Sequence, residues 1–522
     1  MNSPGFYVLW GDRQRSFEIN GKLLSYILSS LRIPYSNKVW DGYYHIEDNP
    51  VDQSVGEKLA KCISQEHISF DLEKRFRHSI GKGGTDYATL MEGRQIRVVD
   101  AVVYPNREEL ICLVSSISAE FGLISFGGGT TVTGGVNPSN SKKYYVSIDA
   151  SNLDHILIHK DYMTVEAGGG VLGPRLEEEL NKNGLTLGHF PESFLHSTVG
   201  GWIATNAAGQ ESNKYGKMRD LVSGVELVTP SGIFNDRTVP NDSAFFQTKD
   251  IAVGSEGTFG VIASARLKVR NQPTKLIFKS YIFNNFEKAV NSMSESFRAG
   301  KVPMVARLSD PVETHLSLLG ADDTFMMKIF RNYLGLRNVG NGGSLLVMVD
   351  EKGRNQRIDG GIRLGPTPAV IWRKTRYDRP YMYNELLKYG IIADTIETAA
   401  VWPGIMPLYS EVNEAFRRSL EDTKADGIIM CHLSHEYSSG SALYFTFLFH
   451  SDSRKVETLL ALRKSIMDTI LSNGGAISHH HGIGRAFSDS LEKYKGNSYE
   501  LLKAIKNKLD PENIMNPGIL DV

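Results

Sequence analysis

A run of glycines directly after an apolar stretch is the feature that most limits how this chain can fold. Residues 123–126 are predicted to form a strand, and residues 127–131 follow as three glycines and two threonines. Glycine adopts backbone conformations closed to other residues, so successive amide groups of such a loop can converge on a phosphate. The GxGxxG spacing of a Rossmann dinucleotide site is missing, which argues against that fold. An ordinary glycine turn would explain this loop taken alone.

The surrounding sequence alternates between strand and helix patterns. Residues 98–105 have the pattern of a buried strand and residues 107–120 that of an amphipathic helix, and together they begin a βα unit. The length of 522 residues favours two or three domains. Further strands are predicted at residues 145–148, 163–167, 220–229 and 276–283, and helices at residues 174–181, 286–299 and 456–472.

Two more segments are rich in small and hydroxyl-bearing residues. Residues 191–209 have too little bulk for a core strand, which is typical of backbone that closely approaches a flat ligand. Residues 253–262 form a further glycine and threonine turn that leads into an apolar strand. A glycine-rich coil without a ligand is the simpler interpretation of residues 191–209, and we rank it below a ligand site.

Charge and cysteine content exclude several functional classes. The formal net charge of -1 provides no excess of Lys and Arg for nucleic acid or an anionic membrane. Cys62, Cys112 and Cys431 are the cysteines, and they show no CxxC spacing, which predicts neither a disulfide framework nor a structural zinc site. No apolar stretch is long enough to span a bilayer, and neither end resembles a targeting signal. We therefore expect a cytoplasmic, enzyme-like protein.

Three adjacent histidines, His479, His480 and His481, are hard to explain by packing and indicate binding or catalysis. Side chains alternate across a strand and turn by about a third of a circle per residue on a helix. At least one of the three must therefore point away from any common ligand. We expect that one to be structural and to donate to a backbone carbonyl group.

Together these motifs resemble the FAD enzymes of the vanillyl-alcohol oxidase and p-cresol methylhydroxylase superfamily, and within it the alkylglycerone-phosphate synthases of ether lipid synthesis. The resemblance runs from about residue 98 to the carboxyl terminus. It implies an α+β fold, with a two-subdomain FAD-binding domain of the p-cresol methylhydroxylase type and an α+β cap domain for the substrate. The implied boundaries are a partly helical N-terminal segment without chemistry of its own at residues 1–95, the FAD-binding domain at 96–271, the cap domain at 272–450, and a helical C-terminal segment over the flavin at 451–522.

Four segments of that family bind FAD, and each has a counterpart here in the same order. No histidine lies in the first glycine loop, residues 127–131, so we expect FAD to be bound noncovalently. The FAD-binding residues implied by the resemblance are Ser125, Phe126, Gly127, Gly128, Gly129, Thr130, Thr131, Glu192, Ser193, Phe194, Leu195, His196, Ser197, Thr198, Thr205, Asn206, Ala207, Ala208, Glu256, Gly257, Thr258, Phe259, Gly260, Val261 and Ile262.

The resemblance also implies catalytic residues. Tyr444 matches the catalytic tyrosine of the synthases, Arg307 matches a functional arginine, and the three histidines match a His triplet of the synthases. The implied reaction exchanges the acyl group of an acyl-dihydroxyacetone-phosphate-like substrate for a fatty alcohol through a flavin N5 adduct, with no net redox change. Tyr444 would accept and return a proton. For this role, nearby cationic groups such as the His triplet and Arg307 would have to lower its pKa.

One departure from the family pattern concerns the substrate. Tyr383 occupies the position at which the synthases have a second arginine. A phenol therefore replaces a planar, permanently charged side chain that can bind phosphate or carboxylate. Arg379, Arg376 or Arg373 would be close enough in sequence to take over this role. The sequence does not choose among them.

A second departure concerns metal binding. Related 2-hydroxy-acid dehydrogenases carry two metal-binding histidines at positions that correspond to Tyr437 and Tyr444 here. Phenols are poor ligands for such a metal. We therefore expect no metal, and a rearranged site with His432 and His435 is the alternative that we rank lower.

The rival function is a metal-independent FAD dehydrogenase or oxidase of a 2-hydroxy acid, of the D-lactate or glycolate type, or of another alcohol. Tyr444 or a histidine of the triplet would be its base. The replacement at Tyr383 favours this rival, whereas the missing His pair disfavours it. A flavin-binding protein without catalysis ranks third. The expected partners are a small-molecule or lipid-like substrate and a second copy of the chain in a homodimer, with peripheral membrane contact if the substrate is a lipid, and without nucleic acid.

Overall fold

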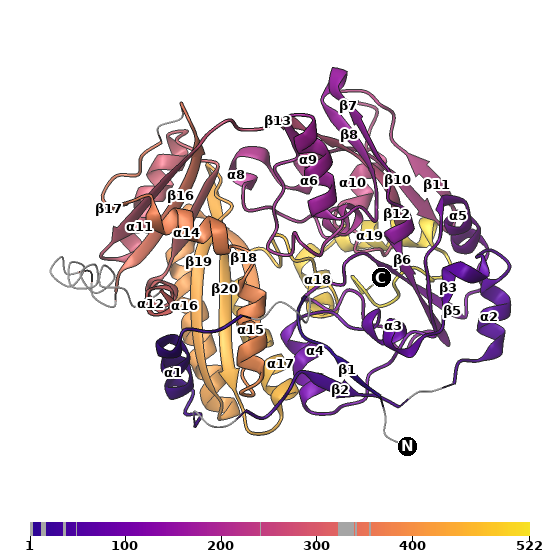
Figure 1. Cartoon of the computed structure of the whole chain (residues 1–522), viewed down its shortest axis with the longest axis horizontal. Coiled ribbons are helices and arrows are strands. Elements are labelled where there is room, and N and C mark those ends of the chain that lie inside the picture. Colours follow the sequence, from indigo (N-terminus) through magenta and orange to yellow (C-terminus); the bar gives the residue numbers. More distant parts are fainter. Residues whose placement is uncertain are drawn as a thin grey trace.

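The computed structural model describes residues 4–11, 17–34, 38–47, 50–240, 242–321, 339, 342–353 and 356–521. Helices and strands are mixed along the chain, which confirms the predicted α+β class. In Figure 1 a seven-stranded sheet occupies the left half of the molecule, and a four-stranded and a five-stranded sheet occupy the right half. Helix α18 (Ser488–Lys495) lies near the middle of this view, and helix α19 (Ser498–Leu509) lies in the right half (Figure 1).

The four-stranded sheet contains the βα unit that the sequence predicts. Its order is β3-β4-β6-β5, and both β4 and β5 pair with β6 in parallel. Helix α5 (Arg107–Ser116) connects β4 to β5, and its N-cap Asn106 accepts a hydrogen bond from the backbone of Glu109. The helix ends four residues before the predicted boundary, because the chain turns at residues 117–120 to enter β5. The strands are β3 (Ile68–Ser69), β4 (Ala101–Val103), β5 (Phe121–Phe126) and β6 (Tyr144–Asp149).

The five-stranded sheet is antiparallel, with the order β11-β10-β12-β8-β7. Helix α7 (Val199–Ala204) lies within the small-residue segment and begins at Thr198, whose hydroxyl accepts from the backbone N–H of Gly201. The strands are β7 (Ile156–His159), β8 (Thr164–Gly168), β10 (Val222–Thr229), β11 (Gly232–Asn235) and β12 (Val261–Lys268). Short helices beside them are α6 (Gly173–Lys182), α8 (Ser212–Tyr215), α9 (Met218–Leu221) and α10 (Thr248–Ala252).

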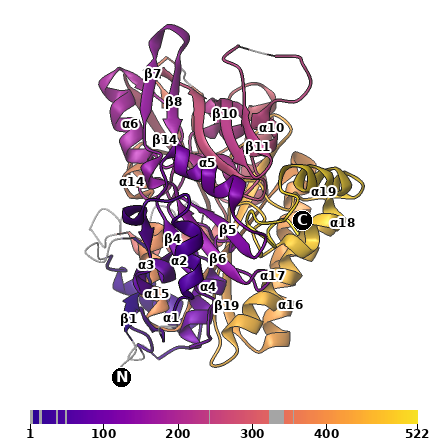
Figure 2. The ribbon, with the colours of Figure 1, turned by 90° about the vertical axis from the view of Figure 1, so that its right-hand side faces the viewer.

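The seven-stranded sheet is antiparallel, and its two faces have different compositions. Successive side chains of a strand point to opposite faces. On β20 the residues Phe445, Phe447 and Phe449 join the core under helices α16 (Trp402–Thr423) and α17 (Lys455–Ser472), which lie side by side (Figure 2). The order is β17-β14-β16-β15-β19-β20-β18. The strands are β14 (Leu276–Phe283), β15 (Val305–Ser309), β16 (Ser344–Glu351), β17 (Ile362–Gly365), β18 (Ile392–Val401), β19 (Asp426–Ser434) and β20 (Gly440–His450).

The remaining elements complete the layers around these sheets. Strand β1 (Gly5–Tyr7) pairs with β2 (Tyr43–His45), and β9 (Leu185–Thr186) pairs with β13 (Arg270–Asn271). Among the described residues, we find no helix with the length and apolar character needed to cross a bilayer. The other helices are α1 (Gly21–Ser30), α2 (Gln53–Leu59), α3 (Leu72–Arg77), α4 (Gly84–Met91), α11 (Phe286–Arg298), α12 (Pro311–Gly320), α14 (Thr367–Thr375) and α15 (Arg379–Leu387).

The carboxyl-terminal tail returns to the first glycine loop. Leu123 of β5 donates to the carbonyl of Ile514 and accepts from the backbone of Asn516, so the tail runs beside β5 in parallel. Asn516 Nδ2 also donates to the carbonyls of Gly135 and Glu256. The tail therefore links the chain on either side of the first glycine loop to Glu256, which lies in a predicted flavin segment far away in the sequence.

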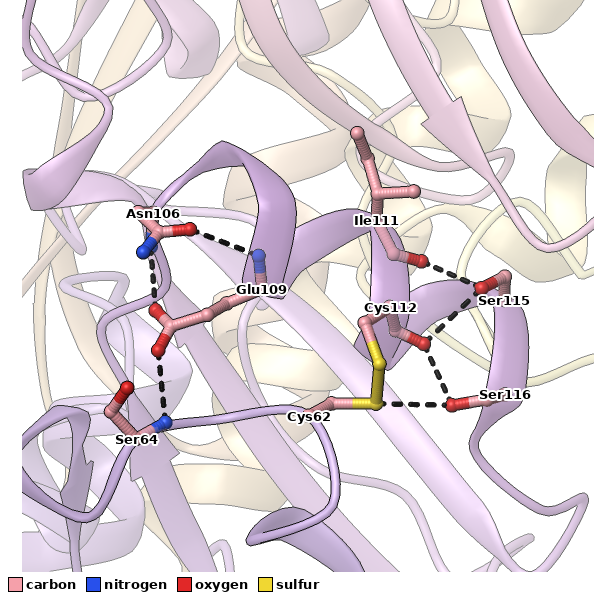
Figure 3. The surroundings of a disulfide bond; sticks show 8 residues. All are labelled: Cys62, Ser64, Asn106, Glu109, Ile111, Cys112, Ser115 and Ser116. Atoms are coloured by element: carbon pink, nitrogen blue, oxygen red, sulfur yellow. Dashed lines mark hydrogen bonds between the residues drawn. A yellow bond between two sulfur atoms is a disulfide. The ribbon is translucent and has the colours of Figure 1, made fainter.

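The structure corrects the prediction about cysteines. Cys62 and Cys112 form a disulfide with Cα atoms 5.4 Å apart, whereas Cys431 is buried and free. Figure 3 shows the bond between Cys62, which follows α2, and Cys112 of α5, near Glu109, which accepts from the backbone of Ser64. No spacing motif marks this pair, because 50 residues separate the two cysteines and only the packing of α2 against α5 brings them together.

Counting thiols tests the disulfide. In denaturant without reductant we expect one reactive thiol, from Cys431, and after reduction three. Under oxidising conditions Cys62→Ser should lower stability by about 2–4 kcal/mol, because the bond limits the conformational freedom of the unfolded chain. Thermal unfolding with and without dithiothreitol checks this expectation. Three reactive thiols before reduction would show that the bond does not form.

Candidate active site

A cavity of about 1550 Å³ is lined by residues from both halves of the molecule. Small-molecule pockets usually measure about 300–1,000 Å³. This cavity therefore has room for a large cofactor and a second molecule.

The first glycine loop packs so closely against a second segment that side chains are excluded. A Cβ atom on Gly128 would lie 1.6 Å from the carbonyl oxygen of His196, and one on Gly127 would lie 2.3 Å from Thr198 Oγ1. Gly129 has a φ of +61°, in the left-handed region that favours glycine. The glycines thus bring the backbone of two predicted flavin segments into contact along one wall of the cavity.

Most of the predicted FAD-binding residues line this cavity, and all four segments contribute. The hydroxyl of Ser125 faces it, is buried and has no hydrogen-bond partner among the described residues. A backbone cradle with an unpaired hydroxyl group fits the phosphates and ring of FAD. The predicted residues that do not line the cavity are Phe194, Leu195, His196, Asn206, Thr258 and Phe259.

The amino-terminal segment, for which the sequence predicted no chemistry of its own, also lines the cavity. Lys82, Gly83 and Gly84 line the wall beside the first glycine loop, and the backbone of Lys82 donates to the carbonyl of Thr131 over 2.8 Å. Burial lowers the pKa of Lys82 to about 8. The glycines at residues 81, 83 and 84 were a signal that sequence reasoning missed.

One face of the seven-stranded sheet places the predicted catalytic residues in a row. Glu397 on β18 pairs with Tyr444 on β20, which pairs with His432 on β19. The row continues to Ser309 on β15, and Arg307 points to the same face because it lies two residues earlier. The rings of Tyr444 and His432 stack with centroids 4.8 Å apart. Strand register, rather than proximity in sequence, therefore assembles this part of the site.

Glu397 holds the His triplet in place through the backbone of the loop. Its carboxylate accepts hydrogen bonds from the N–H groups of His479, His480 and His481 over 2.7, 3.0 and 2.9 Å, and from the hydroxyl of Ser478 over 2.6 Å. Burial alone would raise the pKa of Glu397, but its interactions with these residues outweigh burial and lower the pKa to about 2. Glu397 is therefore ionised at neutral pH.

A second buried carboxylate fixes the glycines that follow. Glu256 accepts from the backbone of Ile483 over 2.6 Å and of Gly484 over 2.8 Å. Gly482, with a φ of +84°, lies so close to Glu256 that a Cβ atom would be 2.8 Å from its carboxyl carbon. Arg485 completes the loop by donating to the carbonyls of Asn137, Pro517 and Gly518.

The three histidines point in different directions, as their adjacency predicts. His480 and His481 line the cavity beside Tyr444, with ring centroids 5.8 and 5.2 Å from it. His479 is not among the lining residues, and its Nε2 lies 2.7 Å from the hydroxyl of Tyr437. The ring of His479 therefore contacts the Tyr437 phenol and the ring of His480, and not the backbone carbonyl that the sequence predicted. Tyr437 is 41 % exposed and lies outside the cavity.

The protonation states correct one prediction. Burial lowers the pKa of His432 to about 4 and holds the pKa values of His480 and His481 below their ordinary value, so these rings are neutral at pH 7. Burial, together with Glu192, raises the pKa of Tyr444 well above its ordinary value. Cationic histidines therefore do not activate Tyr444. The phenol keeps its proton, and the neutral imidazoles are the groups that can accept one.

The structure also places the arginines near Tyr383. Arg307 and Arg379 both donate to Glu313, and both line the cavity, as does Tyr383. Burial raises the pKa of Tyr383 to about 12. Arg373 and Arg376 instead pair with Glu211, and of these two only Arg376 lines the cavity.

Glu397, His479 and His480 offer ligand atoms within 4.8 Å of one another, which is close enough for a metal ion. Both oxygens of Glu397 already accept from N–H and O–H donors, and His479 Nδ1 lies 3.0 Å from His480 Nδ1. A metal here would have to displace these bonds. The expected absence of a metal stays a prediction.

Removing the Glu397 carboxylate tests its role in holding the loop. In Glu397→Ala three backbone donors lose their acceptor. Each unsatisfied buried donor costs about 1–3 kcal/mol, so we expect a large fall in melting temperature and weaker flavin binding. Glu397→Gln keeps one acceptor oxygen, so its melting temperature and flavin binding should fall less than those of Glu397→Ala. A Glu397→Ala variant with the stability and flavin content of the wild type would contradict this role.

Glu256 provides a test that depends on pH. Burial raises its pKa to about 7 from an ordinary value of 4.5. The protonated form of Glu256 is thus favoured in the folded state. Its contribution to the free energy of unfolding is fully present below pH 4.5 and is lost as the pH rises through 7. Its upper limit is about 3 kcal/mol, at about 1.4 kcal/mol per pKa unit. As the pH rises from 5 to 8, the melting temperature of Glu256→Gln should therefore fall less than that of the wild type at equal flavin content. An equal fall in both proteins would contradict the raised pKa of Glu256.

Comparisons with known proteins support FAD as the cofactor. Residues 99–235 match the family described as FAD binding domain, and residues 367–520 match the family described as FAD linked oxidases, C-terminal domain. An alkyldihydroxyacetonephosphate synthase from Trypanosoma brucei brucei is 29% identical, covering 98% of this chain and 91% of the relative. The synthase from Caenorhabditis elegans is 29% identical, covering 100% of this chain and 93% of the relative.

Structural comparison gives the same result. A solved alkyldihydroxyacetonephosphate synthase superposes with a TM-score of 0.81 and 26% sequence identity, covering 98% of each chain. The cradle, the row of residues on the seven-stranded sheet and these matches lead to one conclusion. This chain is an FAD-dependent enzyme that carries an FAD binding domain and a C-terminal domain of the kind found in FAD linked oxidases, and alkyldihydroxyacetonephosphate synthases are its homologues over nearly its whole length.

Proposed function

We propose that this protein exchanges the acyl group of an acyl-dihydroxyacetone-phosphate-like substrate for a fatty alcohol. The observation that carries the proposal is the composition of one cavity. It joins the flavin cradle to Tyr444, to two neutral histidines and to buried arginines, and it extends along apolar walls. Such a cavity suits a substrate with a polar reacting end and a long hydrocarbon chain.

The apolar part of the cavity lies between the amino-terminal helix and the seven-stranded sheet. Helix α1 contributes Leu23 and Ile27, and helix α12 contributes Leu316. Each buried methylene group of a ligand contributes about 0.8 kcal/mol. A chain of lipid length would therefore gain substantial binding energy here. Other apolar residues of the wall are Ile282, Leu345, Val347, Leu364, Ile371, Met430 and Leu448.

The protonation states assign roles within this reaction. His480 or His481, both neutral and beside Tyr444, accepts the proton from the carbon next to the substrate carbonyl. Tyr444, which keeps its proton, donates to the departing oxygen substituent. Residues of the four cradle segments would hold FAD, and bound FAD would supply an electrophilic ring nitrogen for this chemistry.

The rival is an FAD dehydrogenase or oxidase acting on a 2-hydroxy acid or another alcohol. A neutral histidine beside the flavin would also suit that reaction. An anaerobic titration separates the two, because a dehydrogenase substrate bleaches the flavin stoichiometrically. The proposed exchange leaves the flavin oxidised at completion and releases a fatty acid. Bleaching by a D-2-hydroxy acid, with no product from acyl-dihydroxyacetone phosphate and hexadecanol, would replace the proposal with the rival.

A homodimer, peripheral membrane contact and a cytoplasmic location stay predictions. Sedimentation, vesicle flotation and localisation in cells would test them in turn.

Tyr444→Phe tests the assigned proton donor. The variant keeps the ring that stacks on His432 but lacks the hydroxyl, so we expect normal flavin content and turnover reduced about 100-fold or more. Tyr437→Phe is the matched control, because its hydroxyl lies outside the cavity, and it should keep most of the turnover. The measurement is fatty acid release from acyl-dihydroxyacetone phosphate. Undiminished turnover in Tyr444→Phe would contradict the assignment of Tyr444 as the proton donor.

A further inference from the structure

A chain of hydrogen-bonding atoms leads from the protein surface to the cavity through the His triplet. The hydroxyl of Tyr437 lies 2.7 Å from His479 Nε2, and His479 Nδ1 lies 3.0 Å from His480 Nδ1. Tyr437 is 41% exposed, and His480 lines the cavity. The contact with His479 occupies Nδ1 of His480 and leaves its other ring nitrogen, Nε2, available. Three side chains therefore connect water outside the protein with the site.

All three groups are in the protonation state that a proton relay needs. Burial lowers the pKa values of His479 and His480 well below their ordinary value, and burial raises the pKa of Tyr437 to about 12. At neutral pH each imidazole therefore has one N–H donor and one free nitrogen, and the phenol can both donate and accept. The donors of such a chain all point towards the cavity or all point towards water. In the second arrangement His480 Nε2 is free to accept a proton.

The surroundings of the two rings hold them at this distance. Glu397 accepts from the backbone N–H groups of His479 and His480, and Lys217 donates to the backbone carbonyl of His479. The ring of His435 lies against both imidazoles, with centroids 5.3 and 5.0 Å from them. Glu397 Oε2 also lies 3.5 Å from His480 Nδ1. The charged Glu397 can therefore balance a positive charge that forms briefly on His480.

We propose that Tyr437 and His479 form a proton relay that connects His480 with water while the cavity is filled. The inference rests on the proposed function, and it assigns His480 rather than His481 as the base. Neither Tyr437 nor His479 touches the reacting atoms, and both act through His480. A substrate with a hydrocarbon chain would exclude water from the cavity, so its proton would have to exchange through the wall.

One passage through the relay moves one proton to water and leaves each relay group neutral. The C–H proton next to the substrate carbonyl goes to His480 Nε2, and the electron pair of that bond stays with the substrate. His480 passes its Nδ1 proton to His479 Nδ1. His479 then passes its Nε2 proton to the oxygen of Tyr437, which gives its own proton to water. The reverse passage brings a proton of water back to the carbon.

The relay decides which proton returns to the substrate. Without it, His480 would return the proton that it removed, while Glu397 balances the charge of the protonated ring. Turnover can therefore continue without the relay, whereas exchange of the proton with water cannot.

The test follows hydrogen isotopes during the reaction in heavy water. The FAD-loaded enzyme receives acyl-dihydroxyacetone phosphate and hexadecanol, and mass spectrometry measures the deuterium on the reacting carbon per product formed. A sample without enzyme corrects for spontaneous exchange. Tyr437→Phe keeps the ring beside His479 but lacks the hydroxyl. We expect its deuterium per product to fall about tenfold or more, since positioned proton-transfer groups contribute about 10²–10⁴-fold.

Three further variants separate a relay from a structural role. Tyr437→Ala opens His479 to water and should restore most of the deuterium that Tyr437→Phe loses. His479→Gln can bond to both neighbours, but its amide does not pass a proton on, so it should lose deuterium as Tyr437→Phe does. Tyr494→Phe is the matched control, because Tyr494 is a phenol of similar exposure, 43%, on α18, and it should match the wild type. Flavin content and melting temperature show that each variant is folded.

Three results would overturn the relay. They are unchanged deuterium per product in Tyr437→Phe or His479→Gln, an equal loss in Tyr437→Phe and Tyr437→Ala, and a wild-type product without deuterium. The proposed function can fail separately. Exchange of the substrate hydrogen that depends on Tyr437, with no product from hexadecanol, would keep the relay and lose the function. Product with unchanged deuterium in Tyr437→Phe would keep the function and lose the relay.

Discussion

The carboxylate of Glu397 is the group on which the site depends most. It accepts from three successive backbone N–H groups of the His triplet, and it stands opposite Tyr444 in the strand register. One residue thus ties the histidine loop to the strand that carries the tyrosine. Without an acceptor of this kind the buried amide groups of residues 479–481 would be unsatisfied. Because Glu397 binds the backbone of the three histidines and not their rings, the three imidazoles can point into different surroundings.

The seven-stranded sheet divides core from site by alternation along its strands. On β20 the phenylalanines pack under α16 and α17, and Tyr444 and Leu448, which alternate with them, line the cavity. A strand that is apolar on both faces would leave no room for polar chemistry, and one with a polar inner face would lose its core. The seven-stranded sheet therefore supplies both a hydrophobic core and the polar side chains of the site from the same strands.

Burial sets the protonation states in this cavity more than charge pairing does. His432, His480, His481 and Tyr444 are all driven toward their neutral forms by desolvation. The arginines and Glu313 are exceptions, because a guanidinium keeps its charge in proteins and because Arg307 and Arg379 hold the pKa of Glu313 well below its ordinary value. A neutral acid and base beside fixed cations is a suitable setting for moving a proton next to an anionic substrate.

The sequence by itself determined the cofactor, the α+β class and most strand and helix positions. These features depend on local signals, such as Gly127, Gly128 and Gly129 and the apolar periodicities, which act within a few residues. Only the tertiary structure decided which histidine leaves the cavity, which arginine joins Arg307, that Lys82 lines the cradle, and that Cys62 bonds Cys112. Each of these depends on strand register or on packing between distant segments, which no short pattern records. The pKa of Tyr444 also follows from burial, and burial is a property of the folded chain alone.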